Sequence, residues 1–194
     1  MRVYGDYGTC CSMQLIRIKD VNEASFAFVN RLYKDSFPIN ERKDLRFLLS
    51  ENQEIGEIYV VEEENQFIGF VCILFTIEIA HIIYFSVLPE LRNKGYGTNI
   101  LKLICEMKKG YRVIVDIEKP NIDSNNYEQR VQRKNFYLRN CFLETEVEYK
   151  WHGDYFEILS YGGNITDEEL DQFWDNIIQV NEIRFLIGDM HLDL

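Results

Sequence analysis

The chain has 194 residues, of which 46% are hydrophobic and 14% aromatic, and it carries a formal net charge of −11. A soluble chain of this length can bury one sizeable core. The acidic balance argues against a nucleic-acid partner, because phosphate backbones are bound by basic surfaces. We also expect no membrane association, since the longest apolar run, residues 67–75, is about half as long as a membrane-spanning helix requires.

The five cysteines show no spacing typical of a metal site, so we expect no bound metal. Two of them fall inside apolar patterns, where a thiol behaves as a small hydrophobic group. No basic and then apolar leader opens the sequence. These features predict a location in the reducing cytoplasm.

The first elements alternate between strand and helix. Residues 1–12 show no periodicity and are expected to form an N-terminal extension, and residues 13–18 look like the start of a first strand. Asp20 and Glu23 have the spacing of a capping box, which predicts that a helix begins there. Pro38 breaks the chain, and a second helix is predicted over residues 40–50.

Two further strands are predicted at residues 58–61 and 67–75. The dipeptide Glu64-Asn65 between them is typical of a hairpin turn. A buried strand is then predicted over Ile79–Val87.

The segment Arg92-Asn93-Lys94-Gly95-Tyr96-Gly97-Thr98 follows that strand and opens an amphipathic helix, which we expect to be capped by Gly110. The first turn of a helix leaves backbone N–H groups without partners, and its dipole stabilises an anion there. Gly95 and Gly97 allow close backbone approach and positive φ, while Arg92 and Lys94 add positive charge. The segment therefore predicts a phosphate-binding loop.

Two other phosphate-binding motifs fit this loop less well. A P-loop needs a lysine after its glycines, whereas Lys94 precedes them. A dinucleotide fingerprint needs a third glycine, and this chain has Ile100 at that position. Asp116 does stand about where the acidic residue of that fingerprint would be, so dinucleotide binding stays open as a weaker alternative.

The pattern continues with a strand at residues 112–117, a helix that Asn125 and Glu128 could cap, and paired strands at 144–151 and 155–161. Mixed strands and helices in this order predict one α/β layer structure.

The acidity is concentrated at the C-terminus. From Asn164 onward eight acidic residues stand against Arg184 alone, a local balance of −7. Thr166 and Glu169 predict the start of a last helix. We expect an acidic helix and tail, residues 164–194, to pack on or extend from a domain formed by residues 13–163. Its acidic side chains are interpreted as a solvated face, or more weakly as an attraction for a cationic acceptor.

A second motif, Phe136-Tyr137-Leu138-Arg139-Asn140-Cys141-Phe142, lies downstream of the loop. It resembles the Phe-Tyr-x-x-x-Gly-Phe element of the GNAT-type N-acetyltransferase superfamily. The loop resembles the pyrophosphate-binding motif of the same superfamily, with Arg92, Gly95 and Gly97 at its defining positions. The resemblance covers about residues 13–161.

This resemblance implies a mixed, mostly antiparallel central sheet flanked by helices, whose fourth and fifth strands splay apart to admit pantetheine. It implies acetyl-CoA as cosubstrate and transfer of acetyl to an amine of a small molecule or a protein by direct attack in a ternary complex. The cofactor-binding residues that it implies are Phe85, Ser86, Val87, Arg92, Asn93, Lys94, Gly95, Tyr96, Gly97, Thr98 and Tyr137.

In that superfamily the tyrosine of the second motif often protonates the departing thiolate. Tyr137 is therefore the expected general acid, because a phenol with a pKa of about 10 holds its proton at neutral pH. The backbone N–H of Val87 is expected to stabilise the oxyanion.

The sequence indicates the general base less clearly than it indicates the general acid. Glu41 lies in Phe37-Pro38-Ile39-Asn40-Glu41-Arg42, which resembles a short element of a bacterial subgroup on the segment that usually lines the acceptor pocket. Glu118 ends the strand beside the expected splay and is the second choice. Weaker alternatives are Glu78, His81, Asp116 and a water relay.

The sequence departs from the family pattern at two positions. Cys141 replaces a glycine, which predicts a strained or differently built turn. Arg130 replaces the asparagine with which many relatives hold pantetheine, so that arginine either changes pantetheine recognition or takes a phosphate or acceptor. These departures leave a catalytically silent acyl-CoA-binding or sensing module as the alternative function. The chain is expected to be a monomer or a homodimer.

Overall fold

The computed structural model of the protein describes residues 13–49 and 55–181. Its strands are β1 (Met13–Ile18), β2 (Gly56–Glu63), β3 (Gln66–Phe75), β4 (Ile79–Val87), β5 (Arg112–Glu118), β6 (Leu143–Trp151) and β7 (Asp154–Tyr161). Its helices are α1 (Ala24–Ser36), α2 (Tyr96–Met107), α3 (Tyr127–Arg139) and α4 (Asp167–Asn181), with 3-10 turns η1 (Leu45–Leu49) and η3 (Pro89–Leu91).

The described strands are hydrogen-bonded in the order β1-β2-β3-β4-β5-β7-β6. The pairs β1–β2, β2–β3, β5–β7 and β6–β7 are antiparallel, whereas β4–β5 is parallel. The expected mixed, mostly antiparallel sheet flanked by helices is thus confirmed.

The described residues form two compact units. The first contains residues 13–49, 55–74 and 83–109, and the second contains residues 75–82 and 110–181. Strand β4 contributes residues to both. The predicted limits of the domain, at residues 13 and 163, stay a prediction.

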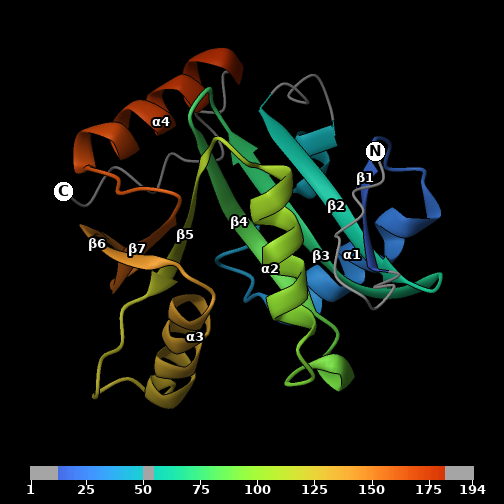
Figure 1. Cartoon of the computed structure of the whole chain (residues 1–194), viewed down its shortest axis with the longest axis horizontal. Helices are drawn as coiled ribbons and strands as arrows, with labels where there is room; N and C mark the ends of the chain where they lie inside the picture. Colours follow the sequence, from blue (N-terminus) through green and yellow to red (C-terminus); the bar gives the residue numbers. More distant parts are fainter. Residues whose placement is uncertain (1–12, 50–54, 182–194) are drawn as a thin grey trace. The chain divides into compact units, whose positions relative to one another are not determined.

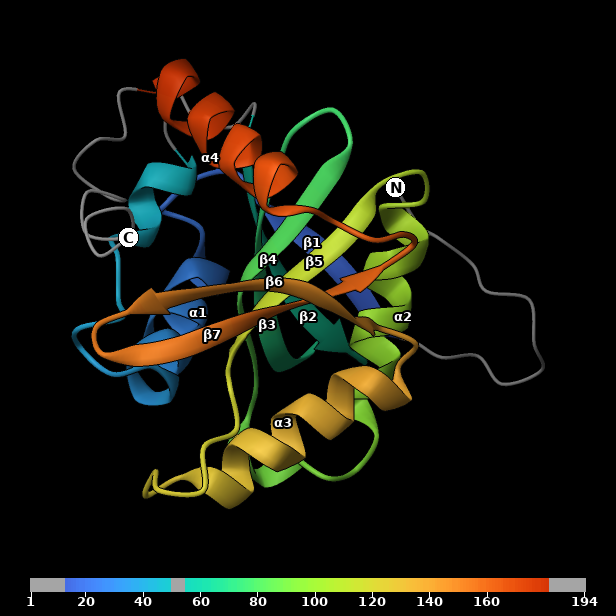
Figure 2. The ribbon, with the colours of Figure 1, turned by 90° about the vertical axis from the view of Figure 1, so that its left-hand side faces the viewer.

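In the first unit, α1 and α2 cover opposite faces of β2 and β3 (Figures 1 and 2). Since both faces are covered, β3 is buried almost continuously from Ile68 to Leu74. The predicted hairpin turn is confirmed: Glu64 and Asn65 both have positive φ, at 51° and 64°, as the tightest hairpin turns require.

The helix predicted over residues 40–50 is wrong in extent, since only Leu45–Leu49 form a single short 3-10 helix. The buried Tyr33 hydroxyl explains the difference. It donates to the carbonyl oxygen of Lys43 at 3.0 Å and accepts from the Lys43 N–H at 2.6 Å. The backbone groups that an α-helix would need there are bonded to a side chain instead.

In the second unit, α3 and α4 lie on opposite sides of β5, β7 and β6 (Figure 2). The capping box at the start of α4 is confirmed, because the Thr166 N–H donates to Glu169 Oε2 at 2.9 Å and the Glu169 N–H donates to Thr166 Oγ1 at 3.3 Å. The buried face of α4 is the predicted one: Leu170, Phe173, Trp174 and Ile177.

Two other helix starts differ from the prediction. Glu23 Oε1 accepts from the Asp20 N–H at 3.0 Å, but this turn precedes α1, which begins at Ala24. Helix α3 has Asn126 rather than Asn125 at its N-cap. The expected extension 1–12 and the tail beyond residue 181 lie outside the described residues. None of the described helices combines the length and the apolar character that a membrane span requires.

Candidate active site

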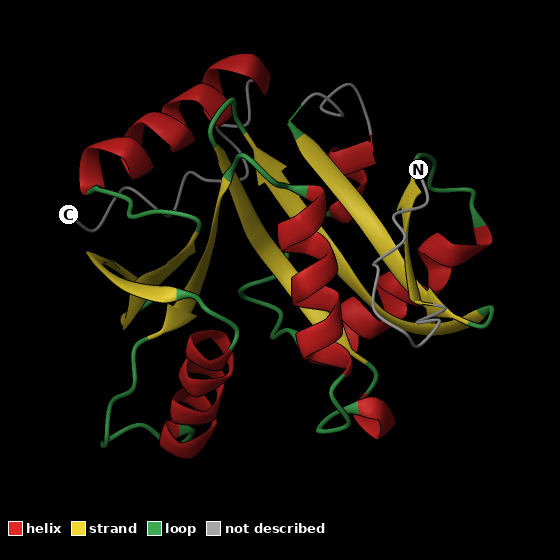
Figure 3. Cartoon of the chain, viewed as in Figure 1, coloured by secondary structure: helices red, strands yellow, loops and turns green. Residues whose placement is uncertain are grey.

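The loop that follows β4 is shaped by two residues with positive φ. Figure 3 shows β4 running into the short turn η3 and then through a loop into α2. Asn93 has φ of 60° and Gly95 has φ of 88°. Positive φ was expected at Gly95 and Gly97, but Gly97 is the second residue of α2 and Asn93 takes that conformation instead. Asparagine tolerates the left-handed region better than most residues, which allows the substitution.

The N-terminus of α2 is suited to anion binding. Gly95 is the N-cap residue and has no side chain with which to cap the first turn, and the first helical bond runs from the Asn99 N–H to the Gly95 carbonyl at 3.1 Å. A Cβ built on Gly95 would meet nothing within 4 Å. The N–H end of the helix is therefore approachable, with Gly97 and Thr98 in its first turn and Lys94 exposed beside it.

Arg92 fastens this loop to the end of β4. Its Nε donates to the carbonyl oxygen of Val87 at 3.0 Å, and Nη2 lies 3.5 Å from Ser86 Oγ. Tyr96 turns its side chain elsewhere, with its hydroxyl donating to Glu63 Oε2 at 3.1 Å. In this structure the Arg92 side chain thus holds the strand end, and the backbone of the loop presents the donors.

Two residues that the sequence interpretation missed also hold the end of β4. The hydroxyls of Ser36 on α1 and Ser86 are 2.7 Å apart. Gly69 on β3 lies so close to β4 that a Cβ there would be 2.3 Å from the Ser86 oxygen and 3.1 Å from the Val87 Cα. An isolated glycine inside a strand pattern signals such a close approach, so Gly69 could have been found from the sequence.

Tyr137 lies in the second unit, on the buried side of α3. Its ring packs edge-on against Phe136 and Phe142 at 5.1 and 5.3 Å. No hydrogen bond to its hydroxyl is found among the described residues, and burial raises the pKa of the phenol above its ordinary 10.0. Tyr137 is therefore a protonated phenol at neutral pH. The turn that follows is strained as expected, since Cys141 has φ of 65°.

The two preferred base residues have different surroundings. Glu41 is partly buried in the first unit, where its carbonyl oxygen accepts from the Tyr84 hydroxyl at 2.9 Å. Glu118, in the second unit, is bonded through Oε1 to Arg130 at 2.9 Å and through Oε2 to Arg133 at 2.8 Å. Both oxygens of Glu118 are already engaged by arginine.

Arg130, which bonds Glu118, is held by several polar side chains of the second unit. Its side chain is 6% exposed and also donates to Asp154 Oδ1 at 2.9 Å and to Asn126 Oδ1 at 2.7 Å. Two carboxylates and an amide therefore hold the guanidinium inside the second unit. This arrangement gives the arginine a local structural role, and its contact with a phosphate or acceptor stays a prediction.

The weaker base alternatives also lie in the second unit. Glu78 is exposed and pairs with Arg112 at 3.2 Å. His81 and Asp116 contact each other, with Nε2 and Oδ1 2.8 Å apart, and the Tyr149 hydroxyl donates to Asp116 Oδ2 at 2.6 Å. No sequence pattern singles out Tyr149, which lies 33 residues after its partner Asp116.

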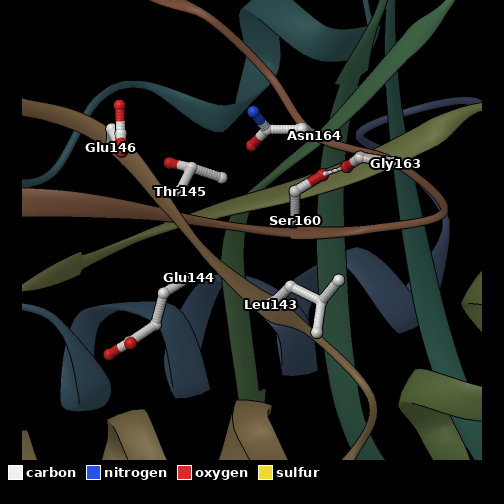
Figure 4. Close-up of a pocket in the computed structure, with 7 residues that line it drawn as sticks. All are labelled: Leu143, Glu144, Thr145, Glu146, Ser160, Gly163 and Asn164. Carbon is white, nitrogen blue, oxygen red and sulfur yellow. Dashed lines mark hydrogen bonds between the residues drawn. The ribbon is translucent and has the colours of Figure 1, made fainter.

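A pocket of about 400 Å³ opens in the second unit where β6 separates from β7 (Figure 4). It is lined by Leu143, Glu144, Thr145, Glu146, Ser160, Gly163 and Asn164, none of which is a predicted site residue. The hydroxyls of Thr145 and Ser160 already donate to the carbonyl oxygens of Ile158 and Gly163. Because its lining contains no predicted site residue, we do not assign this pocket to the predicted acetyl-transfer site.

A family comparison identifies the family to which the loop motif belongs. The sequence model of the acetyltransferase (GNAT) family matches residues 26–131, a little more than half of the chain, and includes the loop of Arg92 to Thr98. The chain belongs to the GNAT acetyltransferase family. It is thus assigned to the acetyl-CoA-dependent N-acetyltransferases, and the resemblance seen in the loop is confirmed. No curated protein was found to match the sequence.

Solved structures of GNAT acetyltransferases share the fold. A GNAT-family protein from Bacteroides thetaiotaomicron is 22% identical with a TM-score of 0.70, over 86% of this chain and 97% of that chain. A spermidine N-acetyltransferase chimera containing Vibrio cholerae sequence is 12% identical with a TM-score of 0.59, over 84% and 99%. The ribosomal-protein-S18-alanine N-acetyltransferase from Escherichia coli is 10% identical with a TM-score of 0.58, over 80% and 97%.

Proposed function

We propose that this GNAT acetyltransferase transfers acetyl from acetyl-CoA to an amine of a small molecule or a protein by direct attack in a ternary complex. The observation that carries the proposal is the approachable N-terminus of α2, opened by Gly95 at φ of 88° and fastened to β4 by the bond from Arg92 to Val87. We expect the protein to act in the cytoplasm as a monomer or homodimer.

On the donor side, the backbone N–H groups of the loop from Asn93 to Thr98 bind the diphosphate of CoA, and Lys94 adds charge. Phe85, Ser86 and Val87 line the pantetheine arm and the acetyl group. The N–H of Val87 donates to the acetyl carbonyl oxygen, where negative charge develops during attack.

Tyr137 donates its proton to the sulfur of CoA as the thiolate departs. Burial raises the pKa of this phenol, so Tyr137 holds its proton before the reaction, as a general acid must. Bound acetyl-CoA supplies an already activated thioester, so the remaining tasks of the protein are positioning and proton transfer.

Glu41 is the preferred base for the proton that the amine loses. Glu118 remains the second choice, since both of its oxygens already accept bonds from arginine.

The test is release of CoA thiol from acetyl-CoA across a panel of amines, with Tyr137→Phe as the variant. We expect kcat to fall roughly 10²-fold while CoA affinity is unchanged, as for the loss of a general acid. Tyr127→Phe, an exposed tyrosine on the same helix, is the matched control and should be neutral. Tight CoA binding without turnover on any amine would support the alternative, a silent acyl-CoA-binding module.

A further inference from the structure

Helix α3 meets the strands of the second unit largely through charged side chains. Arg130, Lys134 and Tyr137 are spaced by four and three residues, so they lie on one face of the helix. The structure describes all of α3, and Arg130 and Tyr137 are its only buried residues. A surface helix normally turns an apolar stripe towards the core. Two of the three inward positions of α3 are cations instead, so ion pairs hold much of this helix in place.

The Arg130 guanidinium bonds the first half of α3 to its surroundings. Its Nε donates to Asn126 Oδ1 at 2.7 Å, at the N-cap of the helix. Nη1 donates to the carbonyl oxygen of Lys119 at 3.3 Å, and Nη2 contacts Glu118 Oε1 and Asp154 Oδ1, both at 2.9 Å. Every nitrogen of the guanidinium is thus bonded. Through these contacts one buried side chain connects α3 to the end of β5 and the start of β7.

Lys134 holds the middle of the helix in the same way. Its Nζ lies 2.7 Å from Glu157 Oε2 on β7 and also contacts Glu144 Oε1 on β6. Burial disfavours the ammonium, but the two carboxylates outweigh burial and raise the pKa of Lys134 above its ordinary 10.5. Glu157 is 7% exposed, and its Oε1 has no hydrogen-bond partner among the described residues. The charge of Lys134 therefore compensates for the burial of this carboxylate.

Tyr137, on the same face, has no polar contact of its own that would fix its hydroxyl. The ring packs edge-on against Phe136 and Phe142, but no hydrogen bond to the hydroxyl is found in the described part of the chain. The position of the hydroxyl consequently depends on where α3 lies. A displacement of about 1 Å is enough to impair a catalytic group strongly.

We propose that Arg130 is a positioning residue for acetyl transfer, which sets the position of the Tyr137 hydroxyl by bonding α3 to β5 and β7. Lys134 supports the same placement from the middle of the helix. This inference rests on the proposed function, in which Tyr137 protonates the sulfur of CoA, and adds to it the residues that hold the acid in place. Arginine suits the role, because its planar guanidinium bonds several acceptors in one fixed geometry and the ammonium of lysine does not.

A double-mutant cycle separates positioning from a merely structural role. The full chain is assayed with acetyl-CoA and whichever of spermidine, tyramine and a tetrapeptide amide it acetylates. Arg130→Met should lower kcat roughly tenfold, because a misplaced general acid loses part of its contribution. In the Tyr137→Phe background the same change should lower kcat by less than about twofold, because the group through which Arg130 acts is gone. A tenfold loss in both backgrounds, or no loss in either, would overturn the inference.

The affinity for CoA distinguishes positioning from a direct contact with the cofactor. Arg130→Met should leave the Kd of CoA unchanged in isothermal titration, whereas loss of an arginine bonded to a phosphate would raise it about tenfold. Such a rise would count against the inference.

Two milder variants keep the test valid if Arg130→Met does not fold. Arg130→Lys and Asp154→Asn both keep a cation on α3 and remove only part of the contacts of Arg130. Each should lower kcat roughly threefold, and neither should do so in the Tyr137→Phe background. Arg139→Met, at an exposed position of the same helix, is the matched control and should be neutral.

A signal from Tyr137 itself makes the inference testable without turnover. In protein labelled with ¹³C at the tyrosine ring, the Tyr137 signal is identified by its absence in Tyr137→Phe. Its chemical shift should change in Arg130→Met and in Asp154→Asn, and not in Arg139→Met. An unchanged Tyr137 signal in Arg130→Met would contradict the inference. A changed signal in a protein that releases no CoA thiol with any amine would contradict the proposed function alone.

Discussion

The Nε of Arg92 lies 3.0 Å from the carbonyl oxygen of Val87, so the first residue of the phosphate-binding loop is bonded to the last residue of β4. This hydrogen bond connects the two ends of the donor site, which are the loop expected to bind diphosphate and the strand end expected to bind the acetyl carbonyl.

Arg92→Met should therefore weaken both functions of this segment. We expect about tenfold lower affinity for CoA, through lost charge and a displaced loop, together with a lower kcat. Isothermal titration with CoA and steady-state kinetics would measure the two effects. Arg139→Met, at an exposed site on α3, is the control. An effect of Arg92→Met on affinity alone would show that the bond to Val87 does not position the strand end.

Gly69→Ala, a substitution on the neighbouring strand β3, should displace the end of β4. The added Cβ would lie 2.3 Å from the Ser86 oxygen, so β3 and β4 would have to separate. We expect a loss of about 1–3 kcal/mol in the free energy of unfolding, typical of overpacking, and reduced acetyl transfer. Gly110→Ala serves for comparison: its φ is 99° but nothing lies within 4 Å, so only backbone strain applies. Urea unfolding of both variants should rank Gly69→Ala as the more damaging.

Cys141→Gly should stabilise the protein. Cys141 is exposed and has φ of 65°, a conformation that costs an L-residue about 1–2 kcal/mol. Glycine also increases the conformational entropy of the unfolded chain, which offsets part of the stabilisation. The net increase in unfolding free energy should therefore be roughly 0.5–1 kcal/mol. Cys141→Ala keeps the strain and should change little. A loss of stability in Cys141→Gly, measured by urea unfolding, would show that the thiol makes a favourable contact.

Asp116 should make the folded state sensitive to acid. Its pKa is lowered in the folded protein, so the stabilisation is present above the unfolded value of about 3.9 and is lost as pH falls through the folded value. At pH 7, Asp116→Asn should cost about 1–3 kcal/mol of unfolding free energy. The difference from wild type should shrink towards pH 3. The exposed Asp123→Asn is the control, and a difference that stays constant with pH would refute the assignment.

The parts of the fold that depend on neighbouring residues were predictable. Strand β4 has the predicted limits, and the hairpin turn at Glu64-Asn65 and the cap at Thr166 and Glu169 form as their local patterns indicate. Each of these features is encoded within a few residues, and no distant contact displaces it in this structure.

The parts that depend on contacts across the fold were not predictable. The helix expected near residues 40–50 is shortened because Tyr33, ten residues earlier, bonds the backbone of Lys43. The cluster of His81, Asp116 and Tyr149 requires the register of four strands, which a single sequence does not specify.

Arg112 has a practical consequence for work with fragments of this protein. It donates to the carbonyl oxygen of Asn164 and to Glu169 Oε1, and so attaches the start of α4 to β5. A fragment trimmed to the family match at residues 26–131 would lose α4, and with it the rings of Phe173 and Trp174 that cover His81. Such a fragment would contain the phosphate-binding loop but would lack Tyr137 and would expose the imidazole of His81 to water, so biochemical work should use the longer chain.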